Sequence, residues 1–275
     1  LSPYWFSRDP LPDLMGLFLG WYGTTGIVTK VSLQLFPKPK FRDLLTFSSG
    51  DLDLIPEFIF DVTQLNLLEN FFIISQEMPK WAQPILYVVI ISGQSEEEFQ
   101  LKKELHKKLL RKYNGKIKLV QEEPAATTMR ESRLPVPPFL ERTADYKKGG
   151  GFEYTGGILP IERIPEAWPN ALEIARKYKM AYILGHQLLT SGHSIMFGLS
   201  YCFNRADEED IERVRRALDE SNKMILDLGG ILWKTEIPGQ KLMMERMDPN
   251  TVELMKKLKK TLDPNGIMNP GNWSD

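Results

Sequence analysis

Between Phe41 and Thr235 the same succession of apolar strands and amphipathic helices occurs twice, and this repetition limits the possible folds most strongly. The first round predicts strands at 44–48, 70–75, 85–92 and 117–120, with helices at 52–65 and 95–112. The second round predicts strands at 152–159, 180–186, 193–203 and 231–235, with helices at 165–178 and 207–228. Two β-α-β-β-α-β rounds build an antiparallel sheet with helices packed on one face. We therefore predict an α+β, ferredoxin-like fold.

The segments outside these rounds have a different character. Residues 124–150 are rich in Pro, Arg and Gly, which predicts a long irregular loop. A further helix is expected near 249–261, followed by an irregular tail. His106 lies in a charged helix and is expected to be exposed.

A glycine-rich turn, Gly20 to Gly26, separates the apolar run 17–19 from the alternating segment 27–36. The pattern predicts strand, turn and strand, ended by Pro37 and Pro39, where we place a domain boundary. Glycines allow positive φ and close backbone approach, so such a turn could cradle a phosphate or follow the edge of a planar heterocycle. A tight strand connection without a ligand is the alternative.

Composition excludes several classes of protein. The 275 residues are 42% hydrophobic and 26% charged, which is ordinary for a globular protein. With 35 basic and 36 acidic side chains, no basic excess favours binding of nucleic acid. The single cysteine, Cys202, excludes an internal disulfide. No apolar run reaches the length of a spanning helix, and we expect a cytoplasmic protein without a transmembrane segment.

The two ends of the chain carry a resemblance to a known family. Residues 17–20 (LFLG), 23–29 (GTTGIVT), 35–39 (LFPKP) and 262–271 (LDPNGIMNPG) resemble the FAD-linked oxidase superfamily, of the vanillyl-alcohol oxidase, glycolate oxidase and D-lactate dehydrogenase type. The resemblance implies that 1–39 is the end of an FAD-binding domain and 40–240 a substrate-binding cap. It also implies that 241–275 returns to the FAD-binding domain. The implied FAD contacts are Gly23, Thr24, Gly26, Ile27, Thr29 and Asn269.

The family's amino-terminal half does not occur in this sequence, so the resemblance implies a partner. We expect an amino-terminal FAD-binding half or subunit, a small-molecule substrate and an oligomeric assembly. Without that half the chain should bind FAD weakly or not at all. The implied function is the cap portion of an FAD-dependent oxidoreductase that transfers hydride from an alcohol or 2-hydroxy acid to flavin. The alternatives are an oxidase or dehydrogenase of 4-alkylphenols or vanillyl-type alcohols, and a non-catalytic assembly subunit.

Two histidines stand near the ends of successive predicted strands, at His186 and His193. The glycolate oxidase branch often has two histidines at this spacing and a later Glu-His, which is similar to Glu236 here, although Ile237 replaces the second histidine. We therefore predict a divalent metal site of His186, His193 and Glu236. Without metal, either histidine is a candidate catalytic residue that accepts the substrate proton.

The phenol-oxidising branch of the family implies a different catalytic set. It uses tyrosines and an arginine to stabilise a phenolate, and Tyr154 and Arg142 are the candidates here, with Tyr201 as another. Arg130, Arg133 and Arg142 could instead hold a carboxylate. The alternatives are a packed aromatic for Tyr154 and surface charges for the arginines.

Overall fold

The computed structural model describes residues 14–76, 85–121, 124–135, 150–189 and 192–274. The chain forms two compact units. The sheet unit runs from Pro39 to Trp233, and the split unit combines the residues up to Lys38 with those from Lys234 onward. Within the described ranges, no helix has the length and apolar character needed to cross a bilayer.

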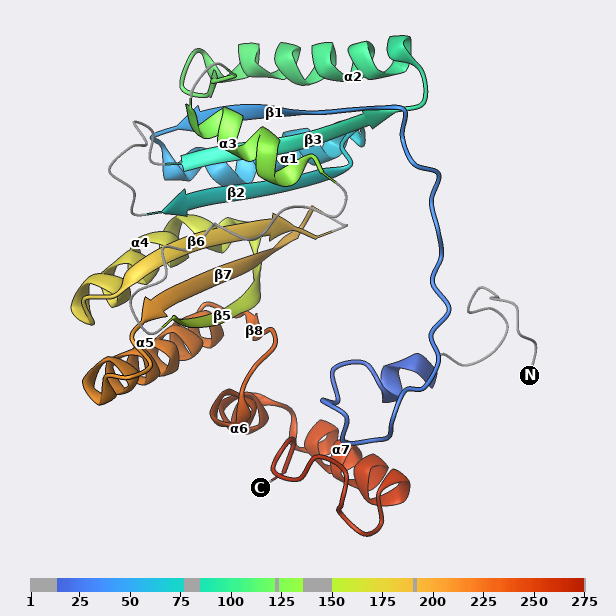
Figure 1. Cartoon of the computed structure of the whole chain (residues 1–275), viewed down its shortest axis with the longest axis vertical. Coiled ribbons are helices and arrows are strands. Elements are labelled where there is room, and N and C mark those ends of the chain that lie inside the picture. Colours follow the sequence, from blue (N-terminus) through green and yellow to red (C-terminus); the bar gives the residue numbers. More distant parts are fainter. Residues whose placement is uncertain (1–13, 77–84, 122–123, 136–149, 190–191, 275) are drawn as a thin grey trace. The chain divides into compact units, whose positions relative to one another are not determined.

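The sheet unit contains one eight-stranded antiparallel sheet (Figure 1). Its strands are β1 (Phe41–Ser49), β2 (Asn70–Gln76), β3 (Ile85–Gly93), β4 (Lys118–Leu119), β5 (Gly151–Pro160), β6 (Ala181–Leu188), β7 (Ser194–Phe203) and β8 (Ile231–Leu232). Its helices are α1 (Ile55–Leu65), α2 (Glu96–Leu109), α3 (Pro124–Arg133), α4 (Ile164–Lys177) and α5 (Glu208–Asp227).

The strand order shows that the sheet consists of two four-stranded halves. The order is β4-β1-β3-β2-β6-β7-β5-β8, so each round forms one half and the halves join where β2 pairs with β6. Phe72 of β2 lies opposite Gln187 of β6, and Ile74 lies opposite Gly185. The predicted α+β fold with a ferredoxin-like antiparallel sheet is confirmed.

Four helices, α1, α2, α4 and α5, pack on one face of the sheet, which we call the helix face. The Phe58 ring of α1 packs edge-on against Phe47 (5.5 Å between centroids) and Tyr87 (5.0 Å). In the second half, Tyr201 of β7 hydrogen-bonds Ser221 of α5 at 3.0 Å. Because side chains alternate along a strand, the neighbours of these residues point to the opposite face, which we call the open face.

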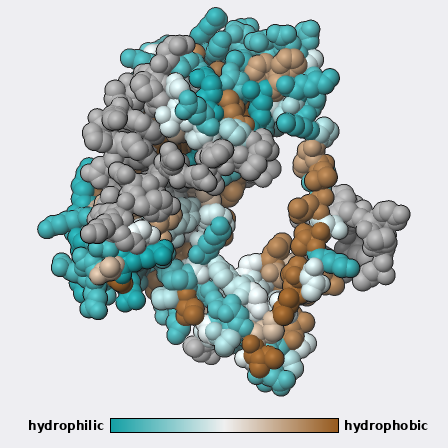
Figure 2. Space-filling view, in the orientation of Figure 1, coloured by the Kyte–Doolittle hydropathy of each residue, from teal (hydrophilic) through white to brown (hydrophobic). Residues whose placement is uncertain are grey.

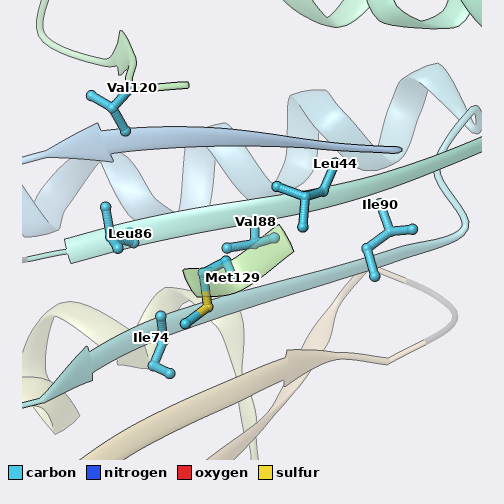
Figure 3. Packing of buried hydrophobic residues seen from close by; sticks show 7 residues of the cluster. All are labelled: Leu44, Ile74, Leu86, Val88, Ile90, Val120 and Met129. Carbon is cyan, nitrogen blue, oxygen red and sulfur yellow. The ribbon is translucent and has the colours of Figure 1, made fainter. Parts of the chain in front are cut away.

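In the first half of the sheet, α3 covers the open face. Its Met129 side chain packs into a buried cluster from β1, β2 and β3 and the residues that follow β4 (Figure 3). The members are Leu44, Ile74, Leu86, Val88, Ile90, Val120 and Met129. The prediction of an irregular loop was therefore wrong for 124–133. Residues 125–133 (AATTMRESR) contain neither proline nor glycine, and burial of the Met129 side chain stabilises the helix.

Local signals explain most of the boundaries that the sequence predicted correctly. The Ser95 hydroxyl accepts the amide hydrogen of Glu98 (3.2 Å) at the start of α2, and the Glu98 carboxylate accepts that of Gln94 (2.9 Å). Gly229, at φ 79°, ends α5 as expected. His106 corrects an expectation, since it is 1% exposed inside α2.

The split unit contains α6 (Ile237–Arg246), α7 (Pro249–Leu262) and a short 3-10 helix, Leu14–Leu17. Neither of the two strands predicted beside the glycine-rich turn is formed. Leu17 ends the 3-10 helix, residues 18–20 form a turn, and 27–36 have no regular secondary structure. A strand needs a neighbour to accept and donate its backbone hydrogen bonds, and the described residues provide none here. The apolar side chains of this segment lie exposed along its length, including Ile27 at 80% and Leu35 at 86% (Figure 2).

Candidate functional site

The glycine-rich turn of the split unit has the backbone conformations that its sequence predicts. Gly20, Gly23 and Gly26 have φ values of 78°, 73° and 155°. The Thr24 hydroxyl donates to the carbonyl of Trp21 (2.7 Å), and both groups are buried. Thr24 therefore holds the shape of the turn with its hydroxyl.

The backbone at Gly23 is accessible to a ligand. Gly23 is exposed, and no atom lies within 4 Å of the position that a Cβ atom would occupy. Ile27 and Thr29, which follow the turn, are also exposed. These features fit the close approach of a planar or anionic group to main-chain atoms, as the resemblance implied for FAD.

The carboxy-terminal tail of the split unit packs against this turn. Nδ2 of Asn269 donates to the carbonyl oxygen of Tyr22, and Nε1 of Trp273 donates to that of Gly20 (2.9 Å). The rings of Tyr22 and Trp273 pack edge-on with centroids 6.0 Å apart. Two motifs that are far apart in sequence therefore form one local structure.

A buried ion pair fixes the tail where α7 ends. Asp263 accepts the amide hydrogens of Ile267 and Met268, each at 3.0 Å, and lies 3.2 Å from Nζ of Lys259. Burial raises the pKa of Asp263, but the two amides and the Lys259 ammonium outweigh it and hold that pKa below its usual value. Lys259 also donates to the carbonyl of Thr24 (3.4 Å), which ties α7 to the turn.

In the sheet unit, Tyr154 of β5 lies on the open face. Its neighbour Thr155 points the other way and hydrogen-bonds Asn222 of α5. The Tyr154 ring packs edge-on against Trp233, with centroids 5.9 Å apart. Burial raises the pKa of Tyr154 to about 12, so its hydroxyl stays protonated and can donate a hydrogen bond at neutral pH.

Three glycines lie side by side beneath this tyrosine, across β5, β7 and β6. Gly156 is opposite Gly198, and Gly198 is opposite Gly185. The Tyr154 hydroxyl occupies the space that a Cβ atom of Gly198 would take, whereas the Cβ position of Gly185 is empty to 4 Å. The sheet is thus bare of side chains here and forms a flat floor beside the Tyr154 hydroxyl.

The structure does not bring His186 and His193 together. His186 is 1% exposed on the helix face, stacked on Phe197 (4.2 Å between centroids) and edge-on to Trp168 (4.8 Å). Neither of its ring nitrogens has a hydrogen-bond partner, and burial lowers its pKa to about 3. His193 is exposed just before β7, beyond the level where Leu188 pairs with Ile195.

The predicted metal site finds no support. Among the described residues, no group of three or more His, Cys, Asp or Glu side chains could hold a metal ion. Packing of the His186 ring between two aromatic rings explains why, since its nitrogens face apolar side chains. Glu236 belongs to the split unit, where it is exposed at the start of α6.

The other candidates have different environments. Tyr201 is fully buried on the helix face, and Arg130 pairs with Asp43 (3.2 Å). Arg142 lies outside the described residues. Arg133, one of the three arginines that could hold a carboxylate, lies in α3, and its guanidinium is 5.1 Å from the centre of the Phe72 ring on the open face.

Comparison with known proteins agrees with this architecture. The family described as FAD linked oxidases, C-terminal domain, matches residues 54–273. The chain belongs to this family, whose members are flavin-linked oxidoreductases.

Individual relatives are distant. Glycolate oxidase subunit GlcD of Bacillus subtilis (strain 168) is 22% identical over 276 residues, which cover 94% of this chain and 56% of GlcD. The structure of p-cresol methylhydroxylase with substrate bound has a TM-score of 0.68 at 14% identity and covers 86% of this chain and 53% of its own. Alkyldihydroxyacetonephosphate synthase has a TM-score of 0.62 at 14% identity and covers 97% and 51%. The chain therefore spans about half the length of these proteins.

Proposed function

We propose that this chain is the cap-bearing portion of an FAD-dependent oxidoreductase that removes hydride from an alcohol or a 2-hydroxy acid. The split unit would complete an FAD-binding domain together with an amino-terminal half, which either precedes it in one polypeptide or is a separate subunit. The sheet unit would hold the substrate.

The exposed apolar side chains of the split unit carry the proposal. Of the 18 exposed large hydrophobic residues in the described part of the chain, 14 belong to the split unit and four to the sheet unit. Trp21 is the one buried hydrophobic residue of the split unit among those described. A protein rarely leaves so much apolar surface in water, so another folded partner is expected to cover it.

The segment 27–36 would pair with that partner as a strand. Ile27, Val31, Leu33 and Leu35 alternate with more polar residues and are 70% to 86% exposed. Pairing would satisfy the backbone and bury this side at once. The exposed Gly23 backbone and the adjacent Asn269 would then contact FAD.

In the substrate reaction, this chain would bind the substrate and receive its hydroxyl proton. Bound FAD would supply the hydride acceptor. His193 is the exposed one of the three histidines and is our candidate proton acceptor. The second function we retain is oxidation of a phenol. There, Tyr154 is the candidate hydrogen-bond donor to a substrate oxygen, because Tyr154 lies above the glycine floor.

These two residues lie far apart along the sheet. Tyr154 is opposite Ser200, whereas Pro160 is opposite Ser194, the residue after His193. At about 3.3 Å per residue these levels differ by roughly 20 Å, so a small substrate would reach only one of the two. Mutation of each residue therefore distinguishes the two functions.

The test uses the chain together with its flavin-binding half. Flavin absorbance reports binding, and bleaching after addition of a substrate reports reduction. Leu33→Asp should lower bound flavin at least about 10-fold, since a charge would be buried at the interface. Ser32→Asp, on the other side of the same segment, is the control and should bind normally. Equal flavin content in all three proteins would refute the proposed interface.

Substrate class is read in the same assay. If 2-hydroxy acids reduce the flavin, His193→Gln should slow reduction about 100-fold and Tyr154→Phe should not, since a general base contributes roughly 10²–10⁴-fold. The reverse dependence with 4-alkylphenols would favour the second function. Normal flavin binding with no effect of either mutation on turnover would favour a non-catalytic assembly role.

A further inference from the structure

The backbone on either side of His193 is held by hydrogen bonds within the hairpin of β6 and β7. The Leu189 amide donates to the Ser194 carbonyl (3.2 Å), and the Gly192 amide donates to the Leu189 carbonyl (3.0 Å). The second of these bonds joins residues three apart and closes a turn directly before His193. We call Gly192 and His193 the hairpin tip.

Gly192 of the hairpin tip lies against Thr63 of α1, so the second half of the sheet unit contacts the first half here. A Cβ atom at Gly192 would lie 2.5 Å from Cγ2 of Thr63 and 2.9 Å from both its Cβ and its Oγ1. Gly192 also has φ 69°, a left-handed conformation that favours glycine. The absence of a side chain at Gly192 therefore allows the hairpin tip to approach α1 this closely.

The Thr63 side chain is itself held in place. Its hydroxyl donates to the carbonyl of Ile59, one turn earlier in α1. A β-branched side chain has few allowed χ1 rotamers, and this hydrogen bond selects one of them. Thr63 therefore presents a fixed surface to the hairpin tip rather than a side chain that can swing away.

The hairpin tip has a second anchor on the side of β5. The carbonyl of His193 accepts the amide hydrogen of Ile161, the residue that follows β5, at 3.2 Å. The imidazole of His193 remains exposed. An exposed side chain thus extends from a backbone that is held by α1 through Gly192 and by Ile161 through a hydrogen bond.

We propose that the contact between Gly192 and Thr63 positions His193 to accept the substrate proton, which makes Gly192 and Thr63 positioning residues. This inference rests on the proposed function, in which His193 is the proton acceptor. A general base must lie within hydrogen-bond reach of the proton that it takes. Displacement of such a group by about 1 Å can slow a reaction about 100-fold, so the backbone that carries it has to be fixed.

The first test measures flavin reduction by a 2-hydroxy acid in the complete enzyme. Gly192→Ala should slow reduction about 10- to 100-fold, because the added methyl group pushes the hairpin tip away from Thr63. If this loss acts through His193, addition of His193→Gln to Gly192→Ala should slow reduction little further, whereas independent losses would multiply. Addition of Thr63→Gly to Gly192→Ala should restore most of the rate, since the added methyl group then takes the space that the Thr63 side chain leaves.

Gly115→Ala is the matched control. Gly115 has φ 79°, and no atom lies within 4 Å of its Cβ position, so alanine adds backbone strain there without a collision. Reduction should keep the wild-type rate. Multiplied losses from Gly192→Ala and His193→Gln, or no recovery with Thr63→Gly, would overturn the positioning role. No effect of His193→Gln by itself would instead contradict the proposed function, which makes His193 the proton acceptor.

The second test does not depend on flavin. In the full chain, hydrogen exchange at the Ile161 amide should speed up in Gly192→Ala and slow again when Thr63→Gly is added, while Gly115→Ala should exchange like wild type. Unchanged exchange in Gly192→Ala would show that the contact does not hold the hairpin tip and would overturn the inference whatever the reaction. Faster exchange with normal flavin reduction would keep the contact and reject its positioning role.

Discussion

Oδ2 of Asp263 lies 3.2 Å from Nζ of Lys259, although both belong to a unit with little apolar core. The same carboxylate accepts two tail amides, those of Ile267 and Met268. Polar contacts therefore hold the glycine-rich turn and the tail together where hydrophobic burial contributes little. The apolar residues of the unit remain exposed, including Ile27 and Leu35.

Asp263→Asn should loosen the tail, because a neutral amide attracts Lys259 less and accepts the two backbone hydrogens more weakly. Hydrogen exchange at the Ile267 and Met268 amides should speed up. Since the pKa of Asp263 is lowered in the folded chain, its stabilisation is present above the unfolded value of about 4 and is lost as the pH falls below it.

The exposed pair of Glu253 and Lys257 on the same helix provides the control for Asp263. Glu253→Gln should leave tail exchange unchanged, since exposed pairs contribute little. Identical exchange in Asp263→Asn and Glu253→Gln would show that the buried carboxylate does not hold the tail.

His186 should make folding stability depend on pH. Its pKa is about 3 in the folded chain, because of burial, and about 6.5 when unfolded, so between these values the unfolded chain binds the extra proton. Stability should therefore fall as the pH drops below 6.5, by up to about 1.4 kcal/mol per pH unit from this residue. His186→Leu, which is apolar and similar in size, should reduce that slope in urea unfolding curves.

A second buried histidine contributes to the same slope. His106 is also buried, and its pKa is lowered by burial, so it should contribute part of the remaining slope. A wild-type slope in His186→Leu would mean that the ring is solvated or partnered in solution.

The fold of the sheet unit could be predicted from sequence because its signals are local. Alternation of apolar residues identified the main strands, and caps such as Ser95 and Gly229 located the helix ends. The helix α6 was missed, although Ile237 and Pro238 at its start followed by helix-forming residues are a readable signal. Burial of His106 was missed because a charged helix can still turn one polar ring inward.

The site was harder to predict, since it depends on which face of the sheet each residue takes. Spacing suggested that His186 and His193 meet, but strand register turns His186 toward α4 and leaves His193 beyond the ladder. The segment 27–36 has the pattern of a strand but no pairing strand among the described residues, so apolar alternation alone does not make it one. The sequence offers Arg133 only as one of three arginines that could hold a carboxylate, and its place over the Phe72 ring comes from the structure.

Gly198 should resist substitution because the Tyr154 hydroxyl fills its Cβ position. Gly198→Ala should displace the tyrosine ring and cost about 1–3 kcal/mol of stability, as overpacking usually does. Trp233 fluorescence should change too, since Trp233 contacts Tyr154. Urea unfolding and emission spectra provide both measurements.

Gly185→Ala is the matched change on the neighbouring strand, where the Cβ position is empty to 4 Å. It should leave stability and fluorescence close to wild type. If Gly198→Ala were as stable as Gly185→Ala, Tyr154 would not pack over the glycine floor.

Asn269 should contribute to flavin affinity by holding the turn through its hydrogen bond to the Tyr22 carbonyl. Loss of one such bond to a partly exposed group corresponds to about 0.5–1.5 kcal/mol, which is roughly a 2- to 12-fold larger dissociation constant for FAD. Asn269 has φ 41°, which alanine tolerates poorly and glycine tolerates well. Asn269→Gly therefore removes the hydrogen bond without adding strain, and Asn269→Ala removes it and adds strain.

FAD titration of the complete enzyme should show weaker binding in both variants, with the alanine variant the weaker binder, while Asn265→Ala in the preceding exposed turn should bind normally. Wild-type affinity in Asn269→Gly would assign any effect of Asn269→Ala to backbone strain and remove the hydrogen bond from the argument.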